Sequence, residues 1–294
     1  MRLPKFEYHD PLTLAGACRI MSELGENARP LAGGTDLLVN LKKGAFSIDH
    51  VVSLSRIQEL RQMARSGNQT EIGACVTVAE LAESNNIATR FKGLQVGAQN
   101  LGSPLIRNRA TAGGNILSAR PAADLPLPLM AYGAEVVLQK AVGERTVSLD
   151  GFFVGPGETL AEPDEILSRI LLKQPPPDSG ACYLKLGIRK ATEIAIVNVA
   201  TFIALDHGGN TIKSARVVLG AVAPVPTRSR SAEKILEGER PDEGLFAEAA
   251  EAAVSDAHPI DDFRASADYR RAMVAVMTKR ALEKAYKEAR ARME

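Results

Sequence analysis

The chain has 294 residues, a length that suits one large domain or two smaller ones. Its 36 lysine and arginine residues against 35 acidic residues give a net charge of +1, which argues against binding to nucleic acid or anionic membranes through bulk charge. The 45% apolar and 24% charged composition excludes wholesale disorder. No apolar run of about 18 residues is present and the amino terminus has no apolar stretch, so we expect a cytoplasmic protein.

The N-terminal part alternates between helix and strand patterns. Asp10 followed by Pro11 is typical of a helix start, and apolar residues at helical spacing then continue to Gly25. A strand, a glycine turn and a helix are predicted over 29–43. Further predicted elements are strands at 48–54 and 71–76 and a helix at 78–83.

The middle of the chain predicts helical pieces over 87–109, and then a segment, 110–118, that is too rich in glycine for a plain helix or strand. Residues 134–140 and 145–149 are typical of paired strands, and 166–172 of a closing strand.

A proline-rich segment, 174–180, is the strongest linker signal, because three consecutive prolines can continue neither a helix nor a sheet. We therefore place a domain boundary there. Beyond it, strands are predicted at 182–188, 196–206 and 211–222, and helices at 229–237, 242–253 and 266–291. Strands followed by helices indicate an α+β domain.

Cysteines and histidines are few and scattered: Cys18, Cys75, Cys182, His9, His50, His207 and His258. The cysteine spacing fits neither a disulfide framework nor an iron–sulfur site, and the histidines show no HExxH motif and no close pair. We expect packed thiols and no metal bound by this chain.

Two segments place paired glycines among small and hydrogen-bonding residues: Leu31-Ala32-Gly33-Gly34-Thr35-Asp36 and Thr111-Ala112-Gly113-Gly114-Asn115. Backbone N–H groups at such turns can hold a phosphate without basic side chains, and glycine would leave the space that the ligand needs. Neither segment fits GxGxxG or GxxxxGK[ST]. Each is either a structural turn or one side of a pyrophosphate site.

Asp124 lies in an apolar, helix-breaking stretch, as either a helix N-cap or an acceptor for ribose or ribityl hydroxyls. Residues 183–195 combine a strand with a charged loop, which by composition is a solvated turn. No catalytic acid–base or nucleophile pattern is present, so we expect no catalytic residue and a cofactor that supplies the chemistry.

As an ordered set, these segments resemble the FAD-binding medium subunits of the molybdenum hydroxylases, the xanthine dehydrogenase and carbon monoxide dehydrogenase family. The resemblance covers essentially the whole chain. The motifs that carry it are residues 32–36, residues 72–74 with Thr77, residues 111–116 with Asp124, residues 164–167, and Lys185 with Arg189.

The resemblance implies an α+β fold. A two-lobed FAD-binding region of the vanillyl-alcohol-oxidase (PCMH) type would span residues 1–176, with lobes of about 1–55 and 56–176. A C-terminal α+β domain, 180–294, would contain a three-stranded antiparallel sheet and helices.

By the same resemblance, FAD would contact a defined set of positions: Leu31, Ala32, Gly33, Gly34, Thr35, Asp36, Thr111, Ala112, Gly113, Gly114, Asn115, Ser118, Asp124, Leu167 and Lys185. Arg189 and Glu193 would lie near the flavin and influence its potential or the approach of an acceptor. Ile196 stands where the animal enzymes carry a basic residue, so NAD, oxygen and quinone all remain open as acceptors.

The resemblance also implies partners: a small subunit with two [2Fe–2S] clusters and a large molybdopterin subunit, assembled as a dimer of heterotrimers. This chain would pass electrons from the clusters to the external acceptor. The alternatives are a self-contained FAD-dependent reductase, similar to the UDP-N-acetylenolpyruvylglucosamine reductases, and a scaffold that binds no cofactor.

Overall fold

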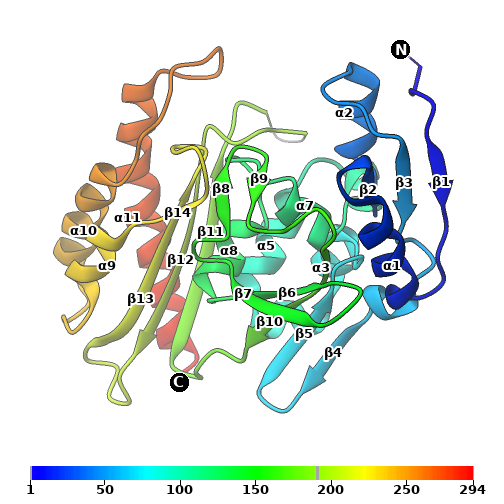
Figure 1. Ribbon diagram of the computed structural model, residues 1–294. Coiled ribbons are helices and arrows are strands. Elements are labelled where there is room, and N and C mark those ends of the chain that lie inside the picture. The colour runs from blue at the N-terminus through cyan, green and yellow to red at the C-terminus, as the bar shows by residue number, and fades with distance from the viewer. Residues whose placement is uncertain (1, 190–191, 294) are drawn as a thin grey trace.

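The computed structural model describes residues 2–189 and 192–293, which form four sheets and their covering helices (Figure 1). This mixture of helices and strands confirms the α+β class. Among the helices described, none has both the length and the apolar character that crossing a membrane requires.

The first sheet is small, parallel and N-terminal, with strand order β1-β3-β2. Two helices connect its strands, which confirms the predicted strand, turn and helix over 29–43. The elements are β1 (Glu7–His9), α1 (Leu14–Leu24), β2 (Ala28–Leu31), α2 (Leu37–Lys43) and β3 (His50–Ser53).

Helix α1 begins later than the sequence indicated. Thr13 is its N-cap, and the Thr13 side chain accepts a hydrogen bond from the N–H of Gly16 at 3.1 Å. Asp10 instead forms an ion pair with Arg56 at 3.0 Å. The prediction that Asp10 and Pro11 open the helix was therefore wrong.

The middle region contains a five-stranded antiparallel sheet of order β4-β5-β10-β6-β7. It confirms the predicted pairing of 134–140 with 145–149. The strands are β4 (Met63–Ser66), β5 (Gln69–Gly73), β6 (Glu135–Gln139), β7 (Glu144–Ser148) and β10 (Ile166–Lys173), with a separate ribbon of β8 (Phe153–Gly155) and β9 (Glu158–Thr159). The helices between β5 and β6 are α3 (Val78–Glu83), α4 (Asn85–Arg90), α5 (Lys92–Asn100), α6 (Pro104–Arg107), α7 (Ala112–Leu117) and α8 (Pro126–Ala131).

Helix α7 contradicts the expectation that segment 110–118 forms no regular helix. Thr111 caps it by accepting a hydrogen bond from the N–H of Gly114 at 3.2 Å. The preceding chain is anchored as well, because the N–H groups of Ala112 and Gly113 donate to the carbonyls of Val76 and Ala74, both at 2.9 Å. These contacts offset the low helix propensity of glycine.

The last sheet is antiparallel, with order β11-β12-β13-β14. Three of its strands were predicted, and the structure adds the two-residue β14 as a fourth. The elements are β11 (Ser179–Leu186), β12 (Val197–Leu205), β13 (Ile212–Gly220), β14 (Thr227–Arg228), α9 (Arg230–Leu236), α10 (Glu243–Ser255) and α11 (Ala267–Ala291).

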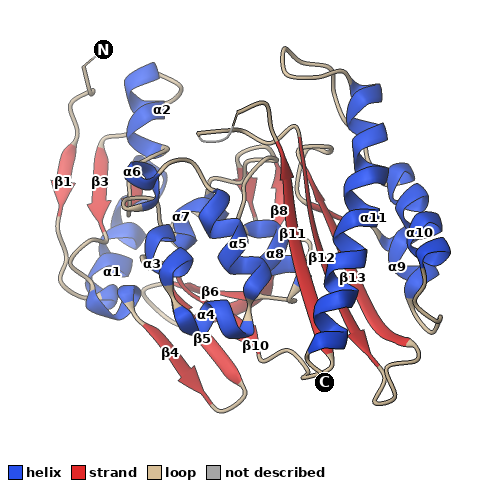
Figure 2. Ribbon diagram, turned by 180° about the vertical axis from the view of Figure 1, so that it is seen from behind, coloured by secondary structure: helices blue, strands red, loops and turns tan. Residues whose placement is uncertain are grey.

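This last sheet is covered on both faces (Figure 2). Helix α11 contacts β11 and β12 on one face, and α5 and α8 contact β11, β12 and β13 on the other. Every residue of β12 is buried; Ala200 and Phe202 join the core of the middle region, whereas Val199 and Ile203 join the core beneath the C-terminal helices. The sheet is therefore a shared wall between two hydrophobic cores.

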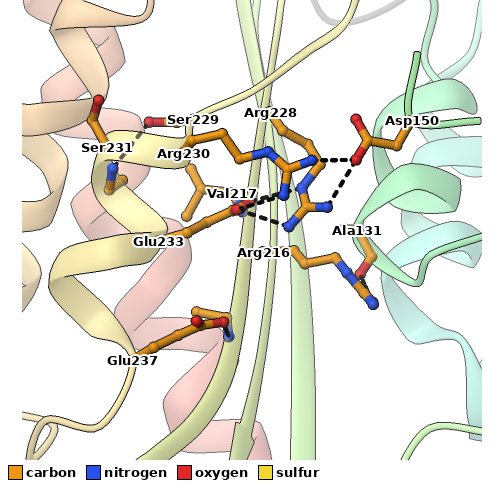
Figure 3. Close-up of polar contacts among 12 residues, drawn as sticks. Ala131, Asp150, Arg216, Val217, Arg228, Ser229, Arg230, Ser231, Glu233 and Glu237 are labelled. Atoms are coloured by element: carbon orange, nitrogen blue, oxygen red, sulfur yellow. Dashed lines mark hydrogen bonds and ion pairs between the residues drawn. The ribbon is translucent and has the colours of Figure 1, made fainter.

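Ion pairs also join the C-terminal elements to the middle region (Figure 3). The guanidinium of Arg228 donates to Glu233 at 2.7 Å and to Asp150, just after β7, at 2.9 Å. Arg230 contacts the same Asp150 carboxylate. Glu233 is 5% exposed and also accepts a hydrogen bond from the N–H of Val217 at 3.0 Å, so strand β13 is tied to helix α9.

We expect Gly180→Ala to destabilise the chain. A Cβ at Gly180 would lie 2.2 Å from the carbonyl oxygen of Ala285 and 2.5 Å from the nitrogen of Ala289, so α11 would have to move away from β11. Overpacking of this kind costs about 1–3 kcal/mol in the free energy of unfolding, which urea denaturation measures. Gly93→Ala is the matched control, since its new Cβ would meet only atoms at 3.5 Å or beyond. Equal stability of the two variants would contradict the prediction.

Candidate functional site

A cavity of about 810 Å³ lies between the N-terminal sheet and the middle region. Residues of the turn 32–36, of segment 110–118, of the β8–β9 ribbon and of segment 161–167 line it. Clefts that bind small molecules and cofactors typically measure about 300–1,000 Å³. The two glycine-rich segments found in the sequence thus face one cavity.

Most of the residues predicted to contact the cofactor line this cavity: Ala32, Gly33, Gly34, Thr35, Asp36, Thr111, Gly113, Gly114, Asn115, Ser118 and Leu167. The structure places the other four elsewhere. Leu31 packs against the small core around Leu41, and Ala112 is fully buried in the middle core. Asp124 and Lys185 lie behind the cavity wall, in contact with each other.

Three of the four glycines are required by the protein's own packing. A Cβ at Gly33 would lie 1.9 Å from the carbonyl oxygen of Arg109, and one at Gly113 would lie 2.7 Å from the Cβ of Ala74. Gly34 has a φ of +74°, which side chains other than glycine rarely adopt. The expectation that all four positions are glycine in order to leave room for a ligand was therefore wrong for these three.

Gly114 is different, because a Cβ there would press against a side-chain hydroxyl that can move, and not against the backbone of another segment. A Cβ there would meet only the Thr111 hydroxyl, at 2.9 Å, and Gly114 is exposed in the cavity wall. At this position, space for a ligand stays a prediction as the reason for glycine.

Backbone donors gather where β2 ends and before α2 begins. Within the described part of the chain, the N–H groups of residues 33–36 have no hydrogen-bond acceptor. Consecutive unpaired N–H groups form a concave site that suits an anion. The turn 32–36 can therefore bind a phosphate through its backbone.

Arginine side chains at the cavity were missed by the sequence analysis. Arg120 is exposed there, and Arg29 lines the same cavity while donating to the carbonyls of Glu26 and Ala28 at 3.0 and 2.8 Å. Arg120 follows the second glycine pair closely in sequence, but no spacing rule singled it out.

Asp124 and Lys185 form a buried ion pair, with side chains 8% and 6% exposed and 2.8 Å between Nζ and Oδ1. The Tyr183 hydroxyl also donates to Asp124, at 2.6 Å. Burial raises the pKa of the Asp124 carboxyl, and the Lys185 ammonium and Tyr183 hydroxyl oppose that shift. Asp124 does not cap a helix, because the N-cap residue of α8 is Leu125. Lys185 is not solvated, because its side chain is buried.

The ion pair lies directly behind the cavity wall. The side-chain oxygen of Asn115, which lines the cavity, accepts a hydrogen bond from the N–H of Leu125 at 3.2 Å. Lys185 also donates to the carbonyl of Asn100 at 3.1 Å. The C-terminal strand β11 therefore supports the second glycine segment from behind.

Residues 187–189 and 192–196, the described part of the charged loop after β11, do not line the cavity. Arg189 and Glu193 pair with each other at 3.1 Å, and the N–H of Thr192 donates to the carbonyl of Gly102 at 3.0 Å. Ile196 is buried in the C-terminal core. Residues 190–191 of this loop lie outside the described residues.

The cysteines are packed thiols. Cys75 lines the cavity, Cys18 lies in α1 and Cys182 in β11. Burial raises the pKa of all three thiols to about 11, so they are protonated at neutral pH and are poor nucleophiles there.

We expect Lys185→Met to lower the free energy of unfolding by about 3 kcal/mol at pH 7, because the Asp124 carboxylate stays buried without its cation. When burial raises the pKa of a carboxyl in the folded state, ionisation of that carboxyl destabilises the folded state. The penalty is complete above the folded-state pKa and disappears below the unfolded-state pKa. The loss should therefore shrink as the pH falls towards about 4, which urea titrations at several pH values measure.

Lys173→Met, at an exposed lysine, is the control for this variant. The double variant Asp124→Asn with Lys185→Met should recover part of the loss. A deficit that stays constant between pH 7 and 4 would contradict the buried-pair interpretation.

Comparisons with known proteins identify the family. Residues 4–174 match the family of the FAD binding domain in molybdopterin dehydrogenase, and residues 182–285 match the CO dehydrogenase flavoprotein C-terminal domain. The carbon monoxide dehydrogenase medium chain of Hydrogenophaga pseudoflava is 35% identical over 96% of this chain and 98% of its own length. The xanthine dehydrogenase FAD-binding subunit of Escherichia coli O157:H7 is 31% identical over 95% of this chain and 95% of its own length.

Solved structures agree. The carbon monoxide dehydrogenase structure from Hydrogenophaga pseudoflava contains a chain with a TM-score of 0.94 and 34% identity, over 98% of this chain and 99% of that one. Quinoline 2-oxidoreductase from Pseudomonas putida 86 contains a chain with a TM-score of 0.91 and 28% identity, over 98% of this chain and 99% of that one. The chain therefore belongs to the family of FAD-binding medium subunits of the molybdenum hydroxylases, as its motifs indicated.

Proposed function

We propose that residues 1–176 hold FAD in the cavity, with 180–294 as a supporting domain, and that the chain carries electrons through a cytoplasmic molybdenum hydroxylase complex. It would accept them from the [2Fe–2S] clusters of a small subunit and deliver them to an external acceptor. The observation that carries this proposal is the convergence of two glycine segments on one cavity of about 810 Å³.

The donor groups of the cavity fit the polar parts of FAD. The unpaired N–H groups of residues 33–36 suit its pyrophosphate, and Arg120 adds a positive charge at the same cavity. Gly114 is exposed at the cavity and presents no side chain there, which leaves room for FAD next to α7. Asp36 and Ser118 supply oxygens for ribityl or ribose hydroxyls, and Leu167 supplies an apolar contact.

Residues behind the wall have a positioning role in this proposal. Leu31 and Ala112 fix the backbone on either side of the glycines through packing. The Asp124–Lys185 pair holds Leu125, and through it Asn115, in place. When FAD is bound, it supplies the exchange of single electrons with clusters and of electron pairs with an acceptor.

Partner subunits are part of the proposal because this chain provides no cluster site. Cys18 lies in α1, Cys75 in the turn after β5 and Cys182 in β11, and burial raises the pKa of all three thiols. Curated relatives are named as medium chains of carbon monoxide and glyceraldehyde dehydrogenases. We propose a small [2Fe–2S] subunit and a large molybdopterin subunit in a dimer of heterotrimers, with the substrate reacting on the large subunit.

Gly114→Val should weaken FAD binding by at least about tenfold, because the branched side chain enters the cavity beside α7. Flavin fluorescence quenching on titration with FAD measures the dissociation constant. Gly244→Val is a matched control: Gly244 is also an exposed glycine in the first turn of a helix, next to the capping side chain of Asp242. Equal FAD affinity of both variants and the unmodified chain would remove this part of the cavity from the FAD site.

The route of the electrons is tested with the chain loaded with FAD. Anaerobically, the flavin should bleach on addition of the reduced small subunit but not on addition of hydroxylase substrates alone, as stopped-flow absorbance at flavin wavelengths records. Reduction by a substrate without any partner would instead support the self-contained reductase. A colourless protein that does not bind FAD would support a scaffold without a cofactor.

A further inference from the structure

We propose a zinc site outside the cavity, on the N-terminal sheet, formed by Glu7, His9 and His50. The Nε2 of His9 lies 3.1 Å from the Nδ1 of His50, and the same Nδ1 lies 3.5 Å from a carboxylate oxygen of Glu7. One ligand atom from each side chain falls within 4.8 Å of the other two. His9 and His50 are 41 positions apart, so their spacing in the sequence gave no sign of this contact.

The strand pairing explains why these side chains meet. Strands β1 and β3 are parallel neighbours, with Glu7 opposite His50. Side chains two positions apart on a strand project from the same face, so Glu7 and His9 share a face of β1 and His50 lies beside them. The backbone register therefore fixes all three ligands on one side of the sheet.

The distances suit a shared divalent ion. Zinc binds histidine nitrogens at about 2.0–2.1 Å and carboxylate oxygens at about 2.0–2.2 Å in tetrahedral geometry. Ligand atoms arranged in this way are separated by about 3.3 Å, close to the 3.1 and 3.5 Å found here. Without an ion, the Nδ1 of His50 would have to serve both a hydrogen bond to His9 and an ion pair with Glu7, whereas one ion can be shared by all three side chains.

The donor set selects the class of ion. Two imidazoles and one carboxylate favour zinc and neighbouring transition metals over calcium and magnesium, which prefer oxygen ligands. The side chain of His50 is 23% exposed and that of Glu7 is 67% exposed, so an ion can enter from solvent. Water would complete the coordination, and the ion would fasten the three-residue edge strand β1 to β3.

The site is tested on the full chain after treatment with a chelator. Zinc should bind at one equivalent per chain in competition with a chromophoric chelator, and His9→Gln or His50→Gln should weaken it by at least about tenfold. Cobalt should give the visible absorption of a tetrahedral nitrogen and oxygen site in the unmodified chain only. His258→Gln, at a histidine remote in the fold, should leave both signals unchanged.

A second readout addresses the role of the ion. Hydrogen exchange at the amides of residues 7–9 should slow when zinc is added to the unmodified chain and should not respond in His50→Gln. Circular dichroism confirms that the variants are folded. The proposal would be overturned if the unmodified chain did not bind zinc. It would also be overturned if the double variant His9→Gln with His50→Gln bound zinc equally strongly.

Discussion

The cavity depends on one close approach between two stretches of backbone. Gly33, in the turn after β2, lies so near the carbonyl of Arg109 that a Cβ would be 1.9 Å from that oxygen. This contact brings the first glycine turn against the chain that leads into α7. Within α7, Gly113 packs closely onto Ala74, because a Cβ at Gly113 would be 2.7 Å from that of Ala74. The position of the cavity wall is therefore set by closely packed backbone segments. Such packing is more rigid than contacts between flexible side chains.

Local sequence patterns predicted the parts of the structure that depend on neighbouring residues. Apolar spacing located three of the four strands of the last sheet and the helices after it, and the paired glycines indicated the two segments that line the cavity. Helix α7 was missed because glycine disfavours helices locally, whereas its hydrogen bonds reach Ala74 and Val76, far back along the chain. Long-range contacts decided that segment.

The remaining misses have the same origin. Asp124 pairs with Lys185 across 61 positions, and His9 meets His50 across 41. Each of these residues alone had an ordinary interpretation, as a cap, a solvated lysine or an isolated histidine. Only the strand register and the packing of β11 behind the middle region bring the partners together. A single sequence contains no local signal for such pairs.

The last sheet links the C-terminal domain to the cavity. Because β12 contributes side chains to two cores, neither the middle region nor the C-terminal helices can repack without disturbing the other. The Asp124–Lys185 pair extends this link to Leu125 and Asn115 at the cavity wall. In the proposed function the C-terminal domain thus helps to position the cavity wall that would hold FAD.

The proposed donors also determine how FAD binding responds to solution conditions. Backbone N–H groups have no titration in the physiological range, and Cys75 in the cavity wall has a pKa of about 11, so it brings no charge near neutral pH. Binding that rests on residues 33–36 should therefore change little with pH. Arg120 is an exposed cation in the wall, the carboxylates of Asp36, Glu158 and Glu162 are exposed there as well, and salt screens such charges over about 10 Å at 0.1 M. The salt dependence of FAD affinity would then report on attraction by Arg120 and repulsion by these carboxylates, whereas the backbone contribution would persist at high ionic strength.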